Sequence, residues 1–144
     1  MIYLDTSVMG AIFFREPGSA EVLNHLLAAS RDGLTSSAWL LTEMASVGGI
    51  KERTGTIDSE LRRDAMAQFQ RFVSARVRVV EVDPGDFRTA ALLLESPYAL
   101  RAGDALHLAM ARRLKARLGS LDRRQIIAAE GLGISVEALM PSSL

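Results

Sequence analysis

Short apolar runs alternate with longer segments of helical periodicity through the sequence. The run at 77–82 is rich in β-branched residues, as strands are, and the longer segments repeat apolar residues at helical spacing. Ser19 and Ser37 stand directly before helical segments and could be their N-caps, and Leu61 is expected on the inward face of the helix at 58–73. The pattern predicts strands at 1–5, 34–36, 77–82, 118–120 and 134–136, and helices at 7–14, 20–29, 38–50, 58–73, 86–95 and 104–117, with a last helix closing over 128–132.

This alternation predicts the fold class: an α/β sandwich of three layers, with a mainly parallel central sheet flanked by helices. The 144 residues contain no internal repeat and no linker, so we expect a single domain over 1–144. Ligands of such sheets bind outside the carboxyl ends of the strands. Asp5 ends the first strand, Glu43 lies in the helix after the second, and Asp122 follows the fourth. We therefore expect these acids at one edge of the sheet.

A fourth acid, Asp104, joins them, and each of the four stands where a solvated charge is not expected. Glu43 interrupts an apolar helical stripe, and Asp104 opens a helix and shares a face with apolar residues. Four carboxylates brought together repel one another unless a cation neutralises them. Simpler explanations remain open: Asp5 and Asp104 as helix caps, Glu43 in an ion pair with an arginine, and Asp122 as a solvated loop residue.

Composition narrows the function classes. The chain has 17 basic and 17 acidic residues, so its net charge gives no general attraction to nucleic acid. It has no cysteine, no visible signal peptide and no apolar run of the ~20 residues that a membrane span needs, which predicts a cytoplasmic protein without membrane association. Nucleotide-binding glycine motifs and zinc-ligand spacings are also missing from the sequence.

Basic residues cluster in one short stretch near the last two acids. Arg112, Arg113, Arg123 and Arg124 could bind phosphates beside the acidic centre, or could simply form a solvated helix face and a charged loop. His107 follows Asp104 by about one helical turn. It could orient a ligand or bind a phosphate, or be a half-buried structural histidine.

Several of these segments resemble the PIN-domain nucleases, and among them the VapC-type toxins of prokaryotic toxin–antitoxin pairs. The block Leu100–Ala109, which contains Asp104, is the most specific match, and Ile2–Ser7, Glu43 and Ala128–Ile134 occur in the expected order. One departure is Ser120, where the family usually has threonine two residues before the fourth acid. The serine keeps a hydroxyl at that position.

The resemblance implies a PIN-like sandwich with divalent-metal-dependent endoribonuclease activity, a homodimer and a cognate antitoxin protein. Under this hypothesis Asp5 and Asp104 hold Mg²⁺ (or Mn²⁺), with Glu43 and Asp122 completing the ligand set. Thr6, Ser120 and His107 would orient these ligands, and the four arginines would contact RNA. The alternatives are a catalytically inactive PIN-like module that binds RNA or protein, a DNA-directed or flap nuclease, and an interaction protein that uses the helix at 58–73.

Overall fold

The computed structural model of the protein describes residues 1–140 and contains a central sheet of five strands. The strand order is β3-β2-β1-β4-β5, and every neighbouring pair is parallel, which confirms the predicted α/β class. The first strand is therefore central, and its carboxyl end lies between the carboxyl ends of β2 and β4. The strands are β1 (Ile2–Leu4), β2 (Leu34–Ser37), β3 (Val77–Val80), β4 (Arg117–Ser120) and β5 (Val136–Ala138).

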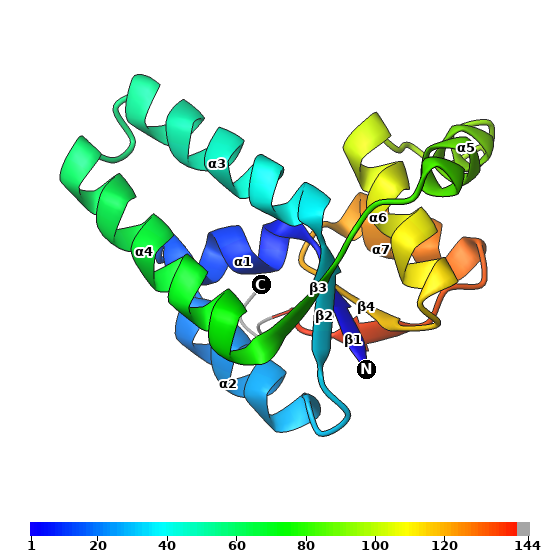
Figure 1. The fold of residues 1–144 in the computed structure, drawn as a ribbon, viewed down its shortest axis with the longest axis horizontal. Coiled ribbons are helices and arrows are strands. Elements are labelled where there is room, and N and C mark those ends of the chain that lie inside the picture. Colours follow the sequence, from blue (N-terminus) through cyan, green and yellow to red (C-terminus); the bar gives the residue numbers. More distant parts are fainter. Residues whose placement is uncertain (141–144) are drawn as a thin grey trace.

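Seven helices in the described residues connect the strands and cover both faces of the sheet (Figure 1). Two of them, α3 and α4, form a long hairpin at the left of that view. None of the helices within residues 1–140 is both long and apolar enough to cross a membrane. The helices are α1 (Thr6–Phe13), α2 (Ser19–Ala29), α3 (Ala38–Arg53), α4 (Ser59–Arg76), α5 (Pro84–Leu93), α6 (Ala102–Arg113) and α7 (Arg123–Gly131).

Alternation along β1 divides the interior into two apolar clusters. Ile2 and Leu4 point to the face covered by α1 to α4, whereas Tyr3 points to the face covered by α5, α6 and α7. All three side chains are fully buried, as expected for a central parallel strand. By the same alternation, Asp5 follows Tyr3 at the carboxyl end of the strand, facing the helix layer that contains α6.

Several predicted helix ends differ from the structure. Helix α6 ends at Arg113 rather than at Arg117, because Lys115 has a left-handed φ of 53° and Arg117 already belongs to β4. Ser19 is the first residue of α2, whose N-cap is Gly18. Leu61 was expected to point inward but is 40% exposed, because the buried face of α4 consists of Ala65, Phe69 and Val73.

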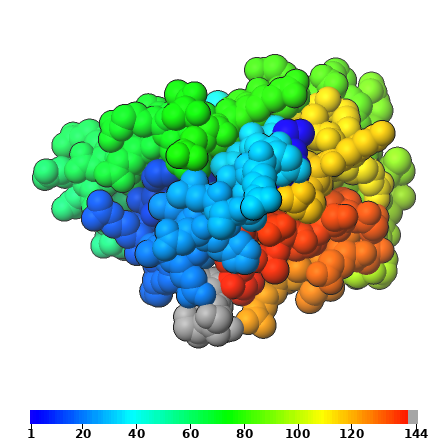
Figure 2. Space-filling model, turned by 90° about the horizontal axis from the view of Figure 1, so that it is seen from below, coloured from blue at the N-terminus to red at the C-terminus, as the bar shows by residue number. Residues whose placement is uncertain are grey.

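The amino ends of the strands carry a network of paired charges. Arg117 contacts Glu137 at 3.1 Å and Asp32 at 3.3 Å, and Asp32 also pairs with the N-terminal amine. These partners, first of all the amine, lower the pKa of Asp32 to about 2. Figure 2 views the molecule from below, where the start of the chain (dark blue) reaches the surface beside the turn before β2. Asp32, Glu137, Arg117 and the N-terminal amine are therefore paired with one another at this edge.

Candidate active site

The four predicted acids line one cleft, of about 390 Å³, at the carboxyl edge of the sheet. Asp5 stands between β1 and α1, Glu43 lies on α3, Asp104 in the first turn of α6, and Asp122 directly before α7. Side chains from four separate parts of the chain thus meet at the edge of the sheet where the topology predicts a ligand. The cleft is also lined by Thr6, Ser7, Glu16, Arg101, His107 and Gln125.

Asp5 is the most deeply buried of these acids, with 1% of its surface exposed. Its Oδ1 accepts a hydrogen bond from Ser7 Oγ at 2.6 Å and one from the Val8 amide at 3.4 Å, so it does cap α1. Burial raises the pKa of Asp5, although a charge on His107 and the hydroxyls of Ser120 and Ser7 oppose that effect. Within residues 1–140, no basic side chain forms an ion pair with Asp5. Apart from a charge on His107, the partners of Asp5 are therefore hydroxyl and amide donors only.

Glu43 is held by two donors that meet on one of its oxygens. Thr6 Oγ1 donates to Glu43 Oε1 at 2.7 Å, and His107 Nε2 lies 2.5 Å from the same atom. Burial alone raises the pKa of Glu43, but the hydrogen bond and charge of His107, together with Thr6, outweigh it and lower the pKa. The basic partner of Glu43 is thus His107, and not the arginine that the ion-pair explanation expected.

Asp104 and Asp122 both bond to backbone amides at helix starts. Asp104 Oδ2 accepts from the Arg101 amide at 3.2 Å, and Asp122 Oδ1 accepts from the Arg124 amide at 3.0 Å. A helix N-terminus favours a carboxylate, so capping explains part of each position. Capping does not explain why both acids also line the cleft with Asp5 and Glu43.

Ser7 is a residue of the cleft whose function the sequence did not reveal. Its Oγ donates to Asp5, accepts a hydrogen bond from the Leu121 amide at 2.8 Å and lies 3.4 Å from Ser120 Oγ. Ser120 Oγ in turn accepts from the Asp122 amide at 3.0 Å. The two serines therefore join the ends of β1 and β4. The available signal was the position of Ser7, two residues after Asp5 in the motif.

The donor chemistry of the cleft fits a hard divalent cation. All four acids offer oxygen, which Mg²⁺ and Mn²⁺ prefer, and the buried Asp5 charge lacks a cationic partner. As the side chains stand, however, no three His, Cys, Asp or Glu groups in the described part of the chain are placed to share one ion. Glu43, Asp104 and Asp122 each bond to protein groups instead. Sharing one cation would therefore bring the acids of the cleft closer together than they stand in the structure.

A comparison of the sequence with protein-family models matches the PIN domain over residues 2–131. The chain belongs to the PIN domain family. This result confirms the resemblance inferred from the sequence motifs. No curated protein sequence matches the chain.

Solved structures share the fold of this PIN domain at low sequence identity. VapC20 from Mycobacterium tuberculosis, described as a toxin that cleaves the sarcin–ricin loop, is 19% identical with a TM-score of 0.67, over 89% of this chain and 95% of that one. FitAcB from Neisseria gonorrhoeae is 16% identical with a TM-score of 0.73, over 96% and 98%. VapBC2 from Rickettsia felis, bound to a promoter DNA fragment, is 16% identical with a TM-score of 0.67, over 95% and 98%.

The arginines predicted to bind RNA lie in two different parts of the PIN domain. Arg123 and Arg124 open α7 beside the cleft, and Arg124 Nε is 3.7 Å from Asp122. Arg112 and Arg113 lie at the other end of α6, about 12 Å along the helix from Asp104. Arg113 is engaged there by Asp86, at 2.8 and 2.9 Å. Arg101, in contrast, lines the cleft, and its side chain forms no ion pair within residues 1–140.

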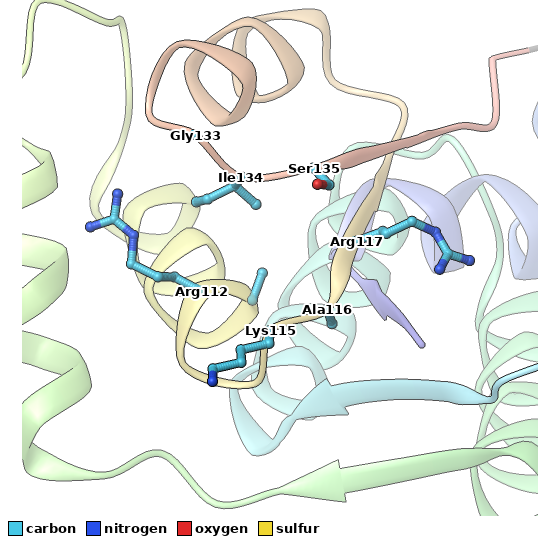
Figure 3. Close-up of a pocket in the computed structure, with 8 residues that line it drawn as sticks. Arg112, Lys115, Ala116, Arg117, Gly133, Ile134 and Ser135 are labelled. Atoms are coloured by element: carbon cyan, nitrogen blue, oxygen red, sulfur yellow. The ribbon is translucent and has the colours of Figure 1, made fainter.

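A second cavity of about 290 Å³ lies at the amino edge of the PIN domain, between the end of α6 and the segment after α7. Arg112, Lys115 and Arg117 line it, which could indicate an anion site. Figure 3 shows instead that the charged ends of these three side chains point away from one another. Arg117 is also paired with Asp32 and Glu137. The cavity therefore lacks the converging donors that an anion requires.

Proposed function

We propose that this PIN domain is a divalent-metal-dependent endoribonuclease, the toxin of a toxin–antitoxin pair. The observation that carries the proposal is the buried Asp5 carboxylate, which forms no ion pair with a described residue and stands in a cleft with the other three predicted acids. Burying an ionised carboxylate without an ion-pair partner costs several kcal/mol, and the raised pKa of Asp5 reflects that cost. A bound cation supplies the compensation.

In the proposed mechanism, Asp5 and Asp104 hold Mg²⁺ (or Mn²⁺), and Glu43 and Asp122 complete its ligand set. Such an ion, when bound, lowers the pKa of a water molecule and stabilises charge that grows on phosphoryl oxygens. Hydrogen bonds within the protein set the positions of the ligands before the substrate arrives. Thr6 and His107 hold Glu43, Ser7 holds Asp5, and Ser120 holds the backbone that leads to Asp122.

Arginine side chains around the cleft are the proposed contacts to the RNA backbone. Arg101 is added to the predicted set because it lines the cleft and forms no ion pair within residues 1–140. Arg123 and Arg124 lie at the same edge of the sheet. Contacts by Arg112 and Arg113 stay a prediction, which requires an RNA that extends along α6 to its far end.

The proposed partners are a structured or single-stranded RNA and a cognate antitoxin protein. Support for the antitoxin comes from relatives of the same fold, which include a toxin–antitoxin complex from Klebsiella pneumoniae. Support for a nucleic-acid loop as substrate comes from VapC20, named as a toxin that cleaves the sarcin–ricin loop. The homodimer and the cytoplasmic location stay predictions, and light scattering of the purified protein would measure the oligomer.

The test is cleavage of total RNA by the purified protein with Mn²⁺ and with EDTA, beside Asp104→Asn. The control is Asp64→Asn, because Asp64 is exposed on α4, away from the cleft. We expect discrete fragments with Mn²⁺ only, absent in Asp104→Asn and unchanged in the control. Without metal, Asp104→Asn should be at least as stable to heat as the parent, because carboxylate repulsion is reduced.

Three other outcomes would contradict parts of this proposal. Full cleavage by Asp104→Asn would remove that residue from the site. A folded protein that neither cleaves RNA nor binds Mn²⁺ would favour the inactive binding module. Cleavage of a matched DNA but not of RNA, in the same preparation, would favour the DNA-directed nuclease.

A further inference from the structure

A continuous series of hydrogen bonds leads from the interior of the sheet to Glu43. Ser37 Oγ, at the end of β2, lies 2.9 Å from the Tyr3 hydroxyl on β1, and that hydroxyl lies 2.7 Å from His107 Nδ1 on α6. His107 Nε2 then contacts Glu43 Oε1 at 2.5 Å. Tyr3 is fully buried and His107 is 2% exposed, so the series runs through protein rather than through solvent.

The hydrogen bond to Glu43 has the same direction whatever the charge of the imidazole. Glu43 is ionised at neutral pH, because its pKa is lowered, and a carboxylate only accepts. His107 Nε2 must therefore carry the hydrogen. Burial raises the pKa of Tyr3, which keeps its proton. A neutral ring accepts from Tyr3 at Nδ1, and a charged ring donates to Tyr3, which then donates to Ser37.

These contacts leave the second oxygen of Glu43 without a protein partner. Thr6 and His107 both use Oε1, and no described group bonds to Oε2. The start of α6 passes close to that atom: a Cβ added to Gly103 would lie 2.8 Å from Oε2. The Glu43 carboxylate is therefore held by hydrogen bonds at Oε1, and its Oε2 stays free of hydrogen bonds from the described residues.

We propose that Tyr3 is a positioning residue, which acts through His107 to fix the Glu43 carboxylate with Oε2 directed to the bound cation and its water. The proposal rests on the proposed function, because it gives Glu43 Oε2 a cation to meet. Its physical basis is that hydrogen-bonded groups behind a metal ligand set the orientation of that ligand. A tyrosine that only filled the interior would act through its ring and would not need its hydroxyl.

Tyr3→Phe separates these two roles, because it removes the hydroxyl and keeps the ring. The matched control is Tyr98→Phe, the same change at a half-buried tyrosine that packs against the same apolar cluster. We expect Tyr3→Phe to weaken Mn²⁺ binding, measured by calorimetry without RNA, by about 10- to 100-fold. We also expect kcat to fall by a similar factor while KM for RNA stays constant. Tyr98→Phe should match the parent in both measurements.

A double-mutant comparison tests whether Tyr3 acts through Glu43. In a Glu43→Gln background, Tyr3→Phe should cause no further loss of Mn²⁺ affinity or of kcat, since the group that it positions has been changed. An undiminished further loss in that background would overturn the proposal. Parent-like Mn²⁺ affinity and kcat in Tyr3→Phe alone would overturn it as well.

Three further outcomes have a defined consequence. If circular dichroism shows Tyr3→Phe to be unfolded, His107→Leu replaces it, because leucine keeps an apolar side chain in this buried position and can hydrogen-bond neither to Tyr3 nor to Glu43. The same losses are expected, and parent-like values would overturn the proposal. If the parent neither binds Mn²⁺ nor cleaves RNA, the proposed function fails and this inference fails with it. If the parent does both and Tyr3→Phe does too, only the inference fails.

Discussion

Asp5 and Asp86 are both buried carboxylates, at 1% and 3% exposure, yet their surroundings are opposite. Burial opposes ionisation of Asp86 too, but the Arg113 guanidinium and the Asp83 amide outweigh it and lower the pKa of Asp86. Arg113 donates from Nε at 2.8 Å and from Nη2 at 2.9 Å, a two-pronged contact. At Asp5, hydroxyls and one amide are the donors, and the pKa is raised. Asp86 is therefore paired with the Arg113 guanidinium, whereas Asp5 forms no ion pair with any described residue.

This difference distinguishes a structural charge from a functional one. Asp86 ties the start of α5 to the end of α6, and its charge is satisfied by the fold. Asp5 lies in a cleft with the other three predicted acids and forms no ion pair with a described residue, which is why we propose that a bound cation compensates its charge. Burial alone would therefore have indicated the same role for Asp5 and Asp86. The presence or absence of a basic partner separates them.

The largest expected effect comes from Asp5→Asn. We expect cleavage to fall by about 10³-fold or more, because the variant loses a ligand of an ion worth several kcal/mol to the transition state. Its free energy of unfolding in EDTA should stay equal or rise, because an uncompensated buried charge is removed. Gel-based cleavage rates and urea denaturation measure the two quantities. A clear loss of stability in EDTA would place Asp5 in the same class as Asp86.

Mn²⁺ should stabilise the parent protein by binding the folded state alone. At 100 times its dissociation constant, it should raise the free energy of unfolding by about 2.7 kcal/mol. The same concentration should have little effect on Asp5→Asn. Thermal denaturation over a Mn²⁺ series checks this, with Ca²⁺ and EDTA as comparisons. Equal stabilisation of both proteins would mean that the ion binds elsewhere.

Asp86→Asn should show the opposite behaviour to Asp5→Asn. We expect a loss of about 2 kcal/mol in stability, below the cost for a fully buried pair because Arg113 is partly exposed. Cleavage per folded molecule should not change. The control is Asp83→Asn, since Asp83 is 60% exposed and 3.4 Å from Arg113, and its effect should be under about 0.5 kcal/mol. Equal losses for the two variants would contradict this reading.

Acid should remove the contribution of Asp86. Its pKa in the folded protein lies below the ordinary value of 3.8, so its stabilising effect is complete above that value. The effect is lost as the pH falls through the folded pKa. The stability difference between the parent and Asp86→Asn should therefore be constant from about pH 7 to pH 5 and shrink below pH 4. Urea denaturation at each pH measures it, and a difference that grew on acidification would have the wrong sign.

Arg101→Ala should have the smallest of the activity effects. Its side chain lines the cleft without an ion pair in residues 1–140, so we expect it to contact a phosphate of the substrate. Losing one charge-assisted hydrogen bond, worth about 1.5 kcal/mol, should lower kcat/KM by about tenfold. Arg88→Ala, an exposed residue of α5, is the matched control and should leave kcat/KM unchanged. An unchanged value for Arg101→Ala would exclude that contact.

The sequence predicted the cleft because its signals are local. The alternation of elements places the ends of parallel strands at one edge, and Asp5 and Asp122 directly follow such ends. Glu43 was visible because it interrupts an apolar helical stripe. The parallel sheet and the edge where the acids meet could therefore be inferred before any coordinates.

What the sequence could not show depends on contacts between distant residues. Ser37 was expected to cap α3 with its side chain, yet its hydroxyl bonds to Tyr3 instead. The two ring nitrogens of His107 face Tyr3 and Glu43, 104 and 64 positions away in the sequence, and no local pattern records such a pairing. Helix α6 ends early because Lys115 adopts a left-handed conformation without the glycine that usually signals one.

Under the proposed function, Gly103 offers a practical way to handle a protein that is toxic to its host. A methyl group there would meet Glu43 Oε2 at 2.8 Å and Trp39 Nε1 at 3.1 Å, so Gly103→Ala would displace the carboxylate without deleting any acid of the cleft. Gly103 has ordinary helical backbone, so alanine would not strain the main chain. Such a variant would leave the outer surface intact, which makes it a suitable reagent for capturing the antitoxin and uncleaved RNA from living cells.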